Sequence, residues 1–225
     1  MGQGISEVLP FAIGIAISPI PIIAIILILF STRARVNGPA FLAGWVVGLS
    51  VASAVVYALS QAANVGTESG ASDTTSWGKI LLGVVLLGMA RRNWAKRPKA
   101  GETPELPKWM ATVETITPAR AFGLAVLLSV VNPKNLILAV GAAAGLSQLD
   151  LDTTDAVVAL AVFVAVASIS VAFAVIYELV GGERAKATLD EMKEWMTVHN
   201  SAVMAVLFLV FGVVLISKGL GPLSV

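Results

Sequence analysis

The stretch Ala121–Leu149, AFGLAVLLSVVNPKNLILAVGAAAGLSQL, decides the fold of this chain. Lys134 is the only charged residue of this stretch. The stretch is longer than the roughly 20 apolar residues that a helix needs to cross a bilayer. Pro133 lies near its middle and removes a backbone donor, so a helix here must be interrupted. The stretch therefore predicts a broken transmembrane helix with a charge beside the break, and a charge at that depth indicates a functional site.

The composition of the whole chain also indicates a membrane protein. Its 225 residues are 57% hydrophobic and 13% charged, with a mean hydropathy of +0.88, whereas soluble domains are about 45–50% apolar and about 25% charged. The apolar surplus must face lipid, which excludes a cytosolic enzyme, a disordered chain and a nucleic-acid-binding domain. Cysteine is absent and histidine occurs once, which excludes Cys-ligated and multi-His metal sites. The sequence also has no HExxH motif, no glycine-rich phosphate loop and no carboxylate cluster with metal-binding spacing, so we expect no metal, no cofactor and no enzyme.

Charge distribution predicts six spans with both termini outside the plasma membrane. With six spans, twelve of the fifteen basic residues fall in inner loops, as the positive-inside rule requires. The third span is weak and depends on Lys79 and Arg91 reaching opposite interfaces. Without it, the most basic loop would merge with an outer loop. The other five stretches are Val8–Thr32, Val36–Thr67, Ala121–Leu149, Ala156–Tyr177 and Trp195–Ser217.

Six spans divide into two sets of three, and an odd number of spans inverts the second set relative to the first. We therefore predict an all-α, single transmembrane domain over residues 1–225, built from two inverted three-helix repeats, a common transporter plan. Helices 1 and 4 are both broken, at Ser18-Pro19-Ile20-Pro21 and at Asn132-Pro133-Lys134-Asn135. The predicted parts are repeat one at about 5–95, a basic inner loop at 96–118, and repeat two at about 119–222 with an amphipathic interfacial helix at 183–198.

The two breaks are the predicted substrate site, because interrupted helices at matching positions mark the binding site of such transporters. Lys134 has no acidic partner within the spans, so it either faces a cavity and an anionic substrate or caps carbonyls freed by the break. Glu178, near the inner end of the fifth span, is a candidate for proton coupling or simply a solvated helix end. The candidate substrate-binding residues are Ser18, Pro19, Pro21, Asn132, Pro133, Lys134 and Asn135.

Small residues predict close helix packing in the second and fourth spans. Gly44 and Gly48 form one GxxxG motif, and Gly141 and Gly145 form another. Such motifs let two helix backbones approach closely. These motifs pack helices of one chain together or form the interface of a homodimer.

The two breaks resemble those of the lysine-exporter (LysE) superfamily. More narrowly, Ile17-Ser18-Pro19-Ile20-Pro21-Ile22-Ile23, Phe41-Leu42-Ala43-Gly44-Trp45-Val46-Val47-Gly48 and Asn132-Pro133-Lys134-Asn135-Leu136 resemble the GAP group. These are the glycopeptidolipid- or sulfolipid-addressing (Sap) proteins of mycobacteria and related actinobacteria. The resemblance extends from helix 1 to helix 6. The first break of the amino-acid exporters reads Pro-Gly-Pro, and the isoleucine here weakens an amino-acid assignment.

The resemblance implies export of a cell-envelope glycolipid, or help in its delivery to the surface. We therefore expect a transporter for an amphiphile with a polar or anionic head group. One alternative is a proton-coupled exporter of an amino acid or a cation. Another is a scaffold that does not transport but organises an envelope-lipid export complex. The expected partners are membrane lipids, a lipid or small-molecule substrate and envelope-lipid export machinery, with no nucleic acid.

Overall fold

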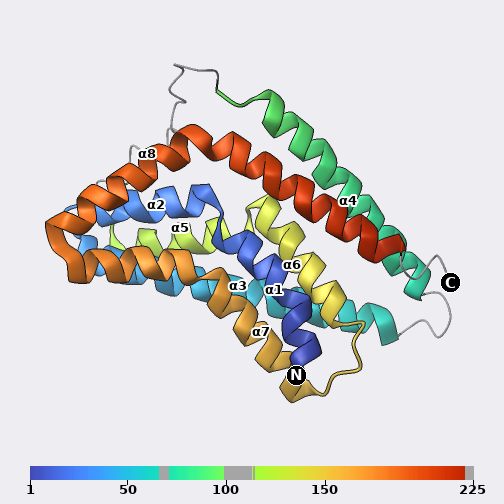
Figure 1. Cartoon of the computed structure of the whole chain (residues 1–225). Helices are drawn as coiled ribbons and strands as arrows, with labels where there is room; N and C mark the ends of the chain where they lie inside the picture. The colour runs from blue at the N-terminus through green and yellow to red at the C-terminus, as the bar shows by residue number, and fades with distance from the viewer. Residues whose placement is uncertain (66–70, 99–112, 114, 221–225) are drawn as a thin grey trace.

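The structure, a computed structural model of the chain, describes residues 1–65, 71–98, 113 and 115–220. All regular secondary structure within these residues is helical, as predicted (Figure 1). Most of the predicted basic inner loop, at residues 99–112 and 114, lies outside the described residues. The helices are α1 (Gly2–Ala16), α2 (Pro19–Leu29), α3 (Ala34–Val65), α4 (Ala71–Ala95), α5 (Pro118–Val130), α6 (Pro133–Leu146), α7 (Thr153–Ala167) and α8 (Ile169–Leu220).

Length and composition allow up to five membrane spans in the described part of the chain. Two helices qualify alone, Ala34–Ala62 and Arg184–Leu220. Three bent pairs qualify as broken spans: α1 with α2, α5 with α6, and α7 with the first part of α8, bent by 53°, 59° and 50°. The apolar helices thus indicate a multi-pass membrane protein, and the two breaks predicted from proline are confirmed as bends.

The weak third span corresponds to α4, which is not among the five. It is a 25-residue helix, and it packs closely along the last part of α8 (Figure 1). A Cβ atom on Gly83 would lie 2.7 Å from the carbonyl oxygen of Gly212, and one on Gly219 would lie 2.7 Å from that of Ser76. A helix that approaches an apolar span so closely along its length supports the six-span prediction, which otherwise stays a prediction.

The break between α7 and α8 was not predicted. The stretch Ala156–Tyr177 contains no proline and reads as one uninterrupted span. In the structure Ser168 separates the two helices, and its hydroxyl donates to the carbonyl of Val164 at 2.7 Å. A serine that bonds back to the preceding turn bends a helix, and this bend brings Ser170 against the end of α1.

The second half of α8 contains both the predicted interfacial helix and the last predicted span, which the sequence predicted as two elements. A kink at Gly182, with φ 56° and ψ −134°, requires glycine because other residues rarely adopt this conformation. Beyond it one helix runs from Arg184 to Leu220, so the predicted interfacial helix at 183–198 continues directly into the last span. Ala185 and Leu189 on its apolar face are buried against the protein.

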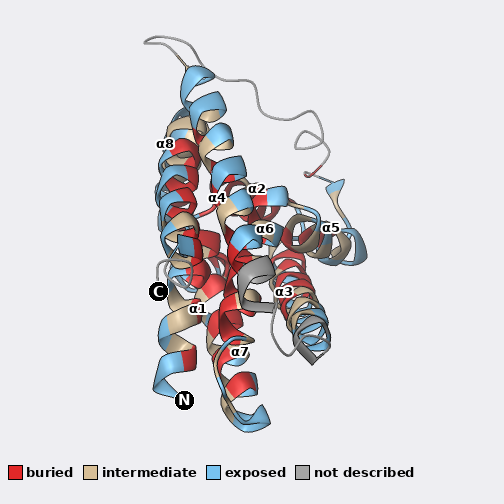
Figure 2. Ribbon diagram, turned by 90° about the vertical axis from the view of Figure 1, so that its right-hand side faces the viewer, coloured by how far each residue is buried: buried red, intermediate tan, exposed pale blue. Residues whose placement is uncertain are grey.

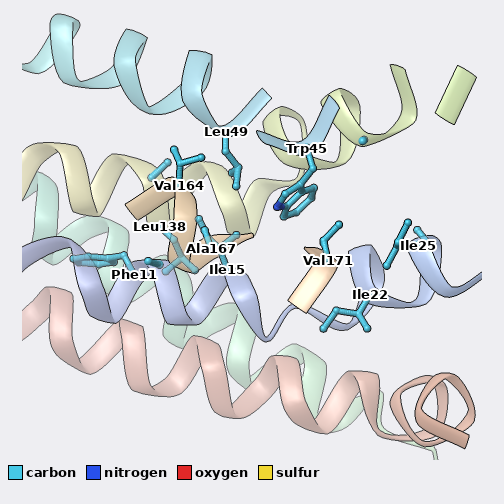
Figure 3. Close-up of a cluster of buried hydrophobic side chains, with 14 of the residues drawn as sticks. Phe11, Ile15, Ile22, Ile25, Trp45, Leu49, Leu138, Val164, Ala167 and Val171 are labelled. Atoms are coloured by element: carbon cyan, nitrogen blue, oxygen red, sulfur yellow. The ribbon is translucent and has the colours of Figure 1, made fainter. Parts of the chain in front are cut away.

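The core lies where the broken helices meet α3, α7 and α8. Figure 2 shows buried residues along the inward faces of the helices and exposed residues on the outer faces. In Figure 3, Phe11 and Ile15 of α1 lie near Leu138, while Trp45 and Leu49 of α3 point into the same interior. Phe11 also stacks on Phe211 of α8, with ring centroids 5.8 Å apart.

The predicted topology is testable because the chain contains no cysteine, so single cysteines report on their own. Asp150→Cys changes an exposed residue between α6 and α7, and Arg97→Cys changes one after α4. On intact cells, a membrane-impermeant maleimide should label the first variant and label the second only after permeabilisation. The cysteine-free parent is the blank, and labelling of both positions from one side would overturn the predicted orientation.

Candidate functional site

The first break leaves carbonyl groups at the end of α1 without helical donors. Pro19 begins α2, and Ser18 before it has an extended backbone, with φ −72° and ψ 116°, as a residue before proline prefers. The N–H of Ser18 donates to the carbonyl of Ile15 at 3.0 Å. It therefore does not donate to the carbonyl of Gly14, which would be its partner in a continuous α-helix. In an apolar interior such a carbonyl needs another donor.

The second break repeats this geometry. Pro133 begins α6, and Asn132 before it has φ −65° and ψ 114°. The Asn132 side chain caps α6 by accepting a hydrogen bond from the backbone N–H of Lys134 at 3.1 Å. The side-chain amide of Asn135 reaches back across the break and donates to the carbonyl of Leu128 at 3.2 Å. Both asparagines therefore stabilise the break itself.

Lys134 connects the two breaks. Its ammonium donates to the carbonyl of Gly14 at 2.6 Å, and its side chain is among the largest that are fully buried, at 1% exposure. Among the described residues it makes no ion pair within 4 Å, so the partner of its amino group is a carbonyl oxygen. The C-terminal end of α1 carries the negative end of a helix dipole, which also favours a cation.

The third break supplies a second donor to α1. The hydroxyl of Ser170, just after the α7–α8 break, donates to the carbonyl of Ala16 at 2.5 Å. Lys134 and Ser170 thus donate hydrogen bonds to two of the carbonyls that the first break leaves without helical donors. Of the two roles predicted for Lys134, the structure shows the capping of a freed carbonyl in this conformation. Sequence reasoning missed Ser170, and no proline marks its position.

Two buried polar atoms at the breaks are available to a ligand. The hydroxyl oxygen of Ser18 and the side-chain oxygen of Asn135 have no hydrogen-bond partner in the part of the chain that the structure describes. Both residues are 1% exposed. Buried polar atoms without partners cost free energy, so each gains from a water or a polar substrate group. Pro19 and Pro21 are buried beside Ser18.

Glu178 lies apart from the breaks. It lines a separate cavity between the α2–α3 turn and α8, and none of the predicted break residues lines that cavity. The predicted proton-coupling residue is therefore not next to Lys134, and its role in coupling stays a prediction.

The four glycines of the GxxxG motifs lie at contacts between helices of the chain. A Cβ atom on Gly44 would lie 2.3 Å from the backbone oxygen of Phe122 in α5, and one on Gly48 would lie 2.0 Å from the hydroxyl of Ser129. Gly141 faces Phe11 of α1 at 2.7 Å, and Gly145 faces the Glu7 carboxylate at 1.9 Å, measured the same way.

The Glu7 carboxylate that faces Gly145 is part of a charged cluster on the predicted outer side. Glu7 of α1 pairs with Lys218 near the end of α8 at 2.5 Å. Lys79 of α4 donates to the side-chain oxygen of Gln148, which follows α6. These contacts hold α1, α4, α6 and α8 together at that end, and the sequence placed Glu7, Lys79 and Lys218 there without predicting that they meet.

Comparison with known proteins identifies the family. No curated protein and no solved structure matches the chain. The family described as Sap, sulfolipid-1-addressing protein, matches residues 8–221, which include all three breaks and the residues around Lys134. The chain therefore belongs to the sulfolipid-1-addressing protein family.

Proposed function

We propose that this protein exports an envelope lipid with an anionic or polar head group across the plasma membrane. The observation that carries the proposal is the hydrogen bond from Lys134 of one broken helix to the Gly14 carbonyl of the other. A buried cation held by a carbonyl rather than a carboxylate can exchange that partner for a substrate anion. The name of the family, which refers to a sulfolipid, supports a lipid as the substrate.

The arrangement of helices supports transport through two inverted repeats. The proline breaks after Ser18 and Asn132 lie at corresponding places, in the first span of each predicted repeat. The packing of α3 against α5 has its counterpart in the packing of α7 against α1, as expected if residues 5–95 and 119–222 are equivalent. Exchange of the Lys134 contact between repeats would then accompany alternating access.

Apolar grooves on the outer faces favour a lipid over a small solute. One groove of about 470 Å³ lies between α4 and α8, lined mainly by apolar side chains such as Leu87, Ala90 and Leu209. Another, of about 260 Å³, lies between α3 and α7 and includes Ser53 and Val164. A lipid tail can remain in such grooves while its head group crosses between the breaks.

Reconstitution tests the proposal directly. Purified protein in liposomes should accelerate the movement of a labelled sulfated glycolipid between leaflets, relative to protein-free liposomes. Cells that lack the protein should retain the same lipid class and expose less of it, as measured by lipidomics of surface extracts against whole-cell extracts. Normal export in cells without the protein, together with no movement in liposomes, would exclude a transporter. Normal movement of an amino acid instead of the lipid would favour the small-solute alternative.

A further inference from the structure

A polar cavity of about 460 Å³ lies at the predicted inner end of the protein. It is formed where the α2–α3 turn meets α8 near the α8 kink, and in Figure 1 both lie at the same end of the molecule. Its volume is in the usual range for small-ligand sites, about 300–1,000 Å³. The residues that line it include Phe30, Ser31, Thr32, Arg33, Arg35, Glu178 and Lys186.

The cavity combines three basic side chains with one buried carboxylate. Arg33 and Arg35 are exposed, and Lys186 lies on the far wall in α8. Glu178 is 8% exposed, and its Oε2 has no hydrogen-bond partner among the described residues. No ion pair within 4 Å joins it to either arginine in this part of the chain. The carboxylate is therefore poised for a donor from a ligand, because an unpaired buried acceptor is costly.

Buried hydrogen bonds hold the α2–α3 turn that carries the two arginines. The amide of Asn37, which is fully buried, donates to the Ser31 hydroxyl at 3.1 Å and to the carbonyl of Ile116 at 2.9 Å. The Ser31 hydroxyl in turn donates to the carbonyl of Ile28 at 2.6 Å. The first turn of α3, which begins at Ala34, adds the positive end of a helix dipole to the same wall.

These groups require a ligand with two kinds of chemistry. Arginine and lysine side chains bind a sulfate or phosphate group through charge-assisted hydrogen bonds. A carboxylate repels that group but accepts hydrogen bonds from hydroxyls. A second cavity of about 430 Å³ shares Phe30 and Lys186 with the first, so the space continues along α8. A sugar bearing an acidic ester satisfies both sets of groups.

We propose that this cavity is an inner head-group site that binds the sulfated or phosphorylated sugar of an anionic glycolipid. The ester lies against Arg33, Arg35 and Lys186, and a sugar hydroxyl donates to Glu178. The inference rests on the proposed function, because it places the head group on the inner side before it reaches the breaks at Ser18 and Lys134.

The test measures binding of octyl glucoside 6-sulfate and 6-phosphate to the full chain in nanodiscs, by microscale thermophoresis. Unesterified octyl glucoside, inorganic sulfate and inorganic phosphate are the comparison ligands. We expect the esterified sugars to bind at least about tenfold more tightly than any of the three, because the contacts are charge-assisted. The double variant Arg33→Gln/Arg35→Gln should lose this preference. Arg120→Gln, an exposed change at the start of α5 outside the cavity, should retain it.

Glu178→Gln separates a sugar site from a simple anion site. If the carboxylate accepts a sugar hydroxyl, the neutral amide oxygen accepts it less strongly, so the preference for the esterified sugars over inorganic sulfate falls several-fold. If the cavity only collects anions, loss of the negative charge strengthens binding of all the anionic ligands to the same extent and leaves that preference unchanged, and this result overturns the proposal. Unchanged affinity in the double arginine variant also overturns it.

The outcome is distinguishable from failure of the proposed export. Lys134 does not line the cavity, so Lys134→Met should bind the esterified sugars normally. Sugar binding without lipid movement in liposomes would retain this site and reject the export function. Lipid movement that is unaffected by the arginine and Glu178 variants would retain the export function and reject this site.

Discussion

Replacing Lys134 with methionine is expected to reduce lipid export by about tenfold to a hundredfold, because hydrogen bonds to charged groups are worth roughly 1.5–3 kcal/mol. Methionine keeps the length of the side chain but removes the ammonium that holds the Gly14 carbonyl. The measurement is the initial rate of movement of a labelled sulfated glycolipid in liposomes. A scaffold without transport activity would tolerate the same change.

Folding should survive this change, because two effects oppose each other. The Gly14 carbonyl loses its donor, at a cost of about 1–3 kcal/mol. A charge is also removed from an apolar span, where insertion scales assign it a cost of about 2.5–3.5 kcal/mol. We therefore expect thermal unfolding of Lys134→Met within a few degrees of the parent.

Ser170→Ala is the matched control, since it also leaves one freed carbonyl of α1, that of Ala16, without its donor. It removes no charge and no group that binds an anion. Export by this variant should stay within about twofold of the parent, because a neutral hydrogen bond contributes only about 0.5–1.5 kcal/mol, and to folding rather than to substrate. Equal losses in the two variants would show that Lys134 acts only by capping the helix.

Gly44→Ala is expected to destabilise the fold by at least about 2 kcal/mol, in the range seen for overpacked interiors. The added Cβ would meet the oxygen, carbonyl carbon and Cα of Phe122 at 2.3, 2.9 and 3.0 Å. All three are backbone atoms of α5, so relief requires α3 and α5 to move apart. The expected result is a lower unfolding temperature in detergent and a smaller monodisperse fraction.

Gly123→Ala is the corresponding control, one residue from Phe122 in the same helix. Its Cβ would meet nothing within 4 Å, and alanine is the better helix former. We expect this variant to unfold at the parent temperature or slightly above. If Gly44→Ala unfolds like Gly123→Ala, the close contact between α3 and α5 is wrong.

The sequence predicted features that depend on residue type at one position. A proline removes a backbone donor, and Pro19 and Pro133 marked the two predicted breaks, since both begin new helices in the structure. Pro10 and Pro39 lie inside α1 and α3 without a break, so the residue type alone does not decide where a helix ends. The sequence did not predict the break at Ser168, because a serine hydroxyl either faces its own helix or does not, depending on what surrounds it. The bonds from Lys134 to Gly14 and from Ser170 to Ala16 join residues more than a hundred positions apart.

By itself the sequence determined that this is a helical membrane protein with a charge beside a proline break, since apolar length and the missing proline N–H are local properties. Only the tertiary structure decided what that charge touches. In the folded chain Lys134 donates to the carbonyl of Gly14 near the end of α1. Glu178 lines a cavity with Arg33 and Arg35, and Lys134 does not line that cavity. The physical reason is that buried polar groups must find partners, and which partners lie within reach depends on how distant helices pack.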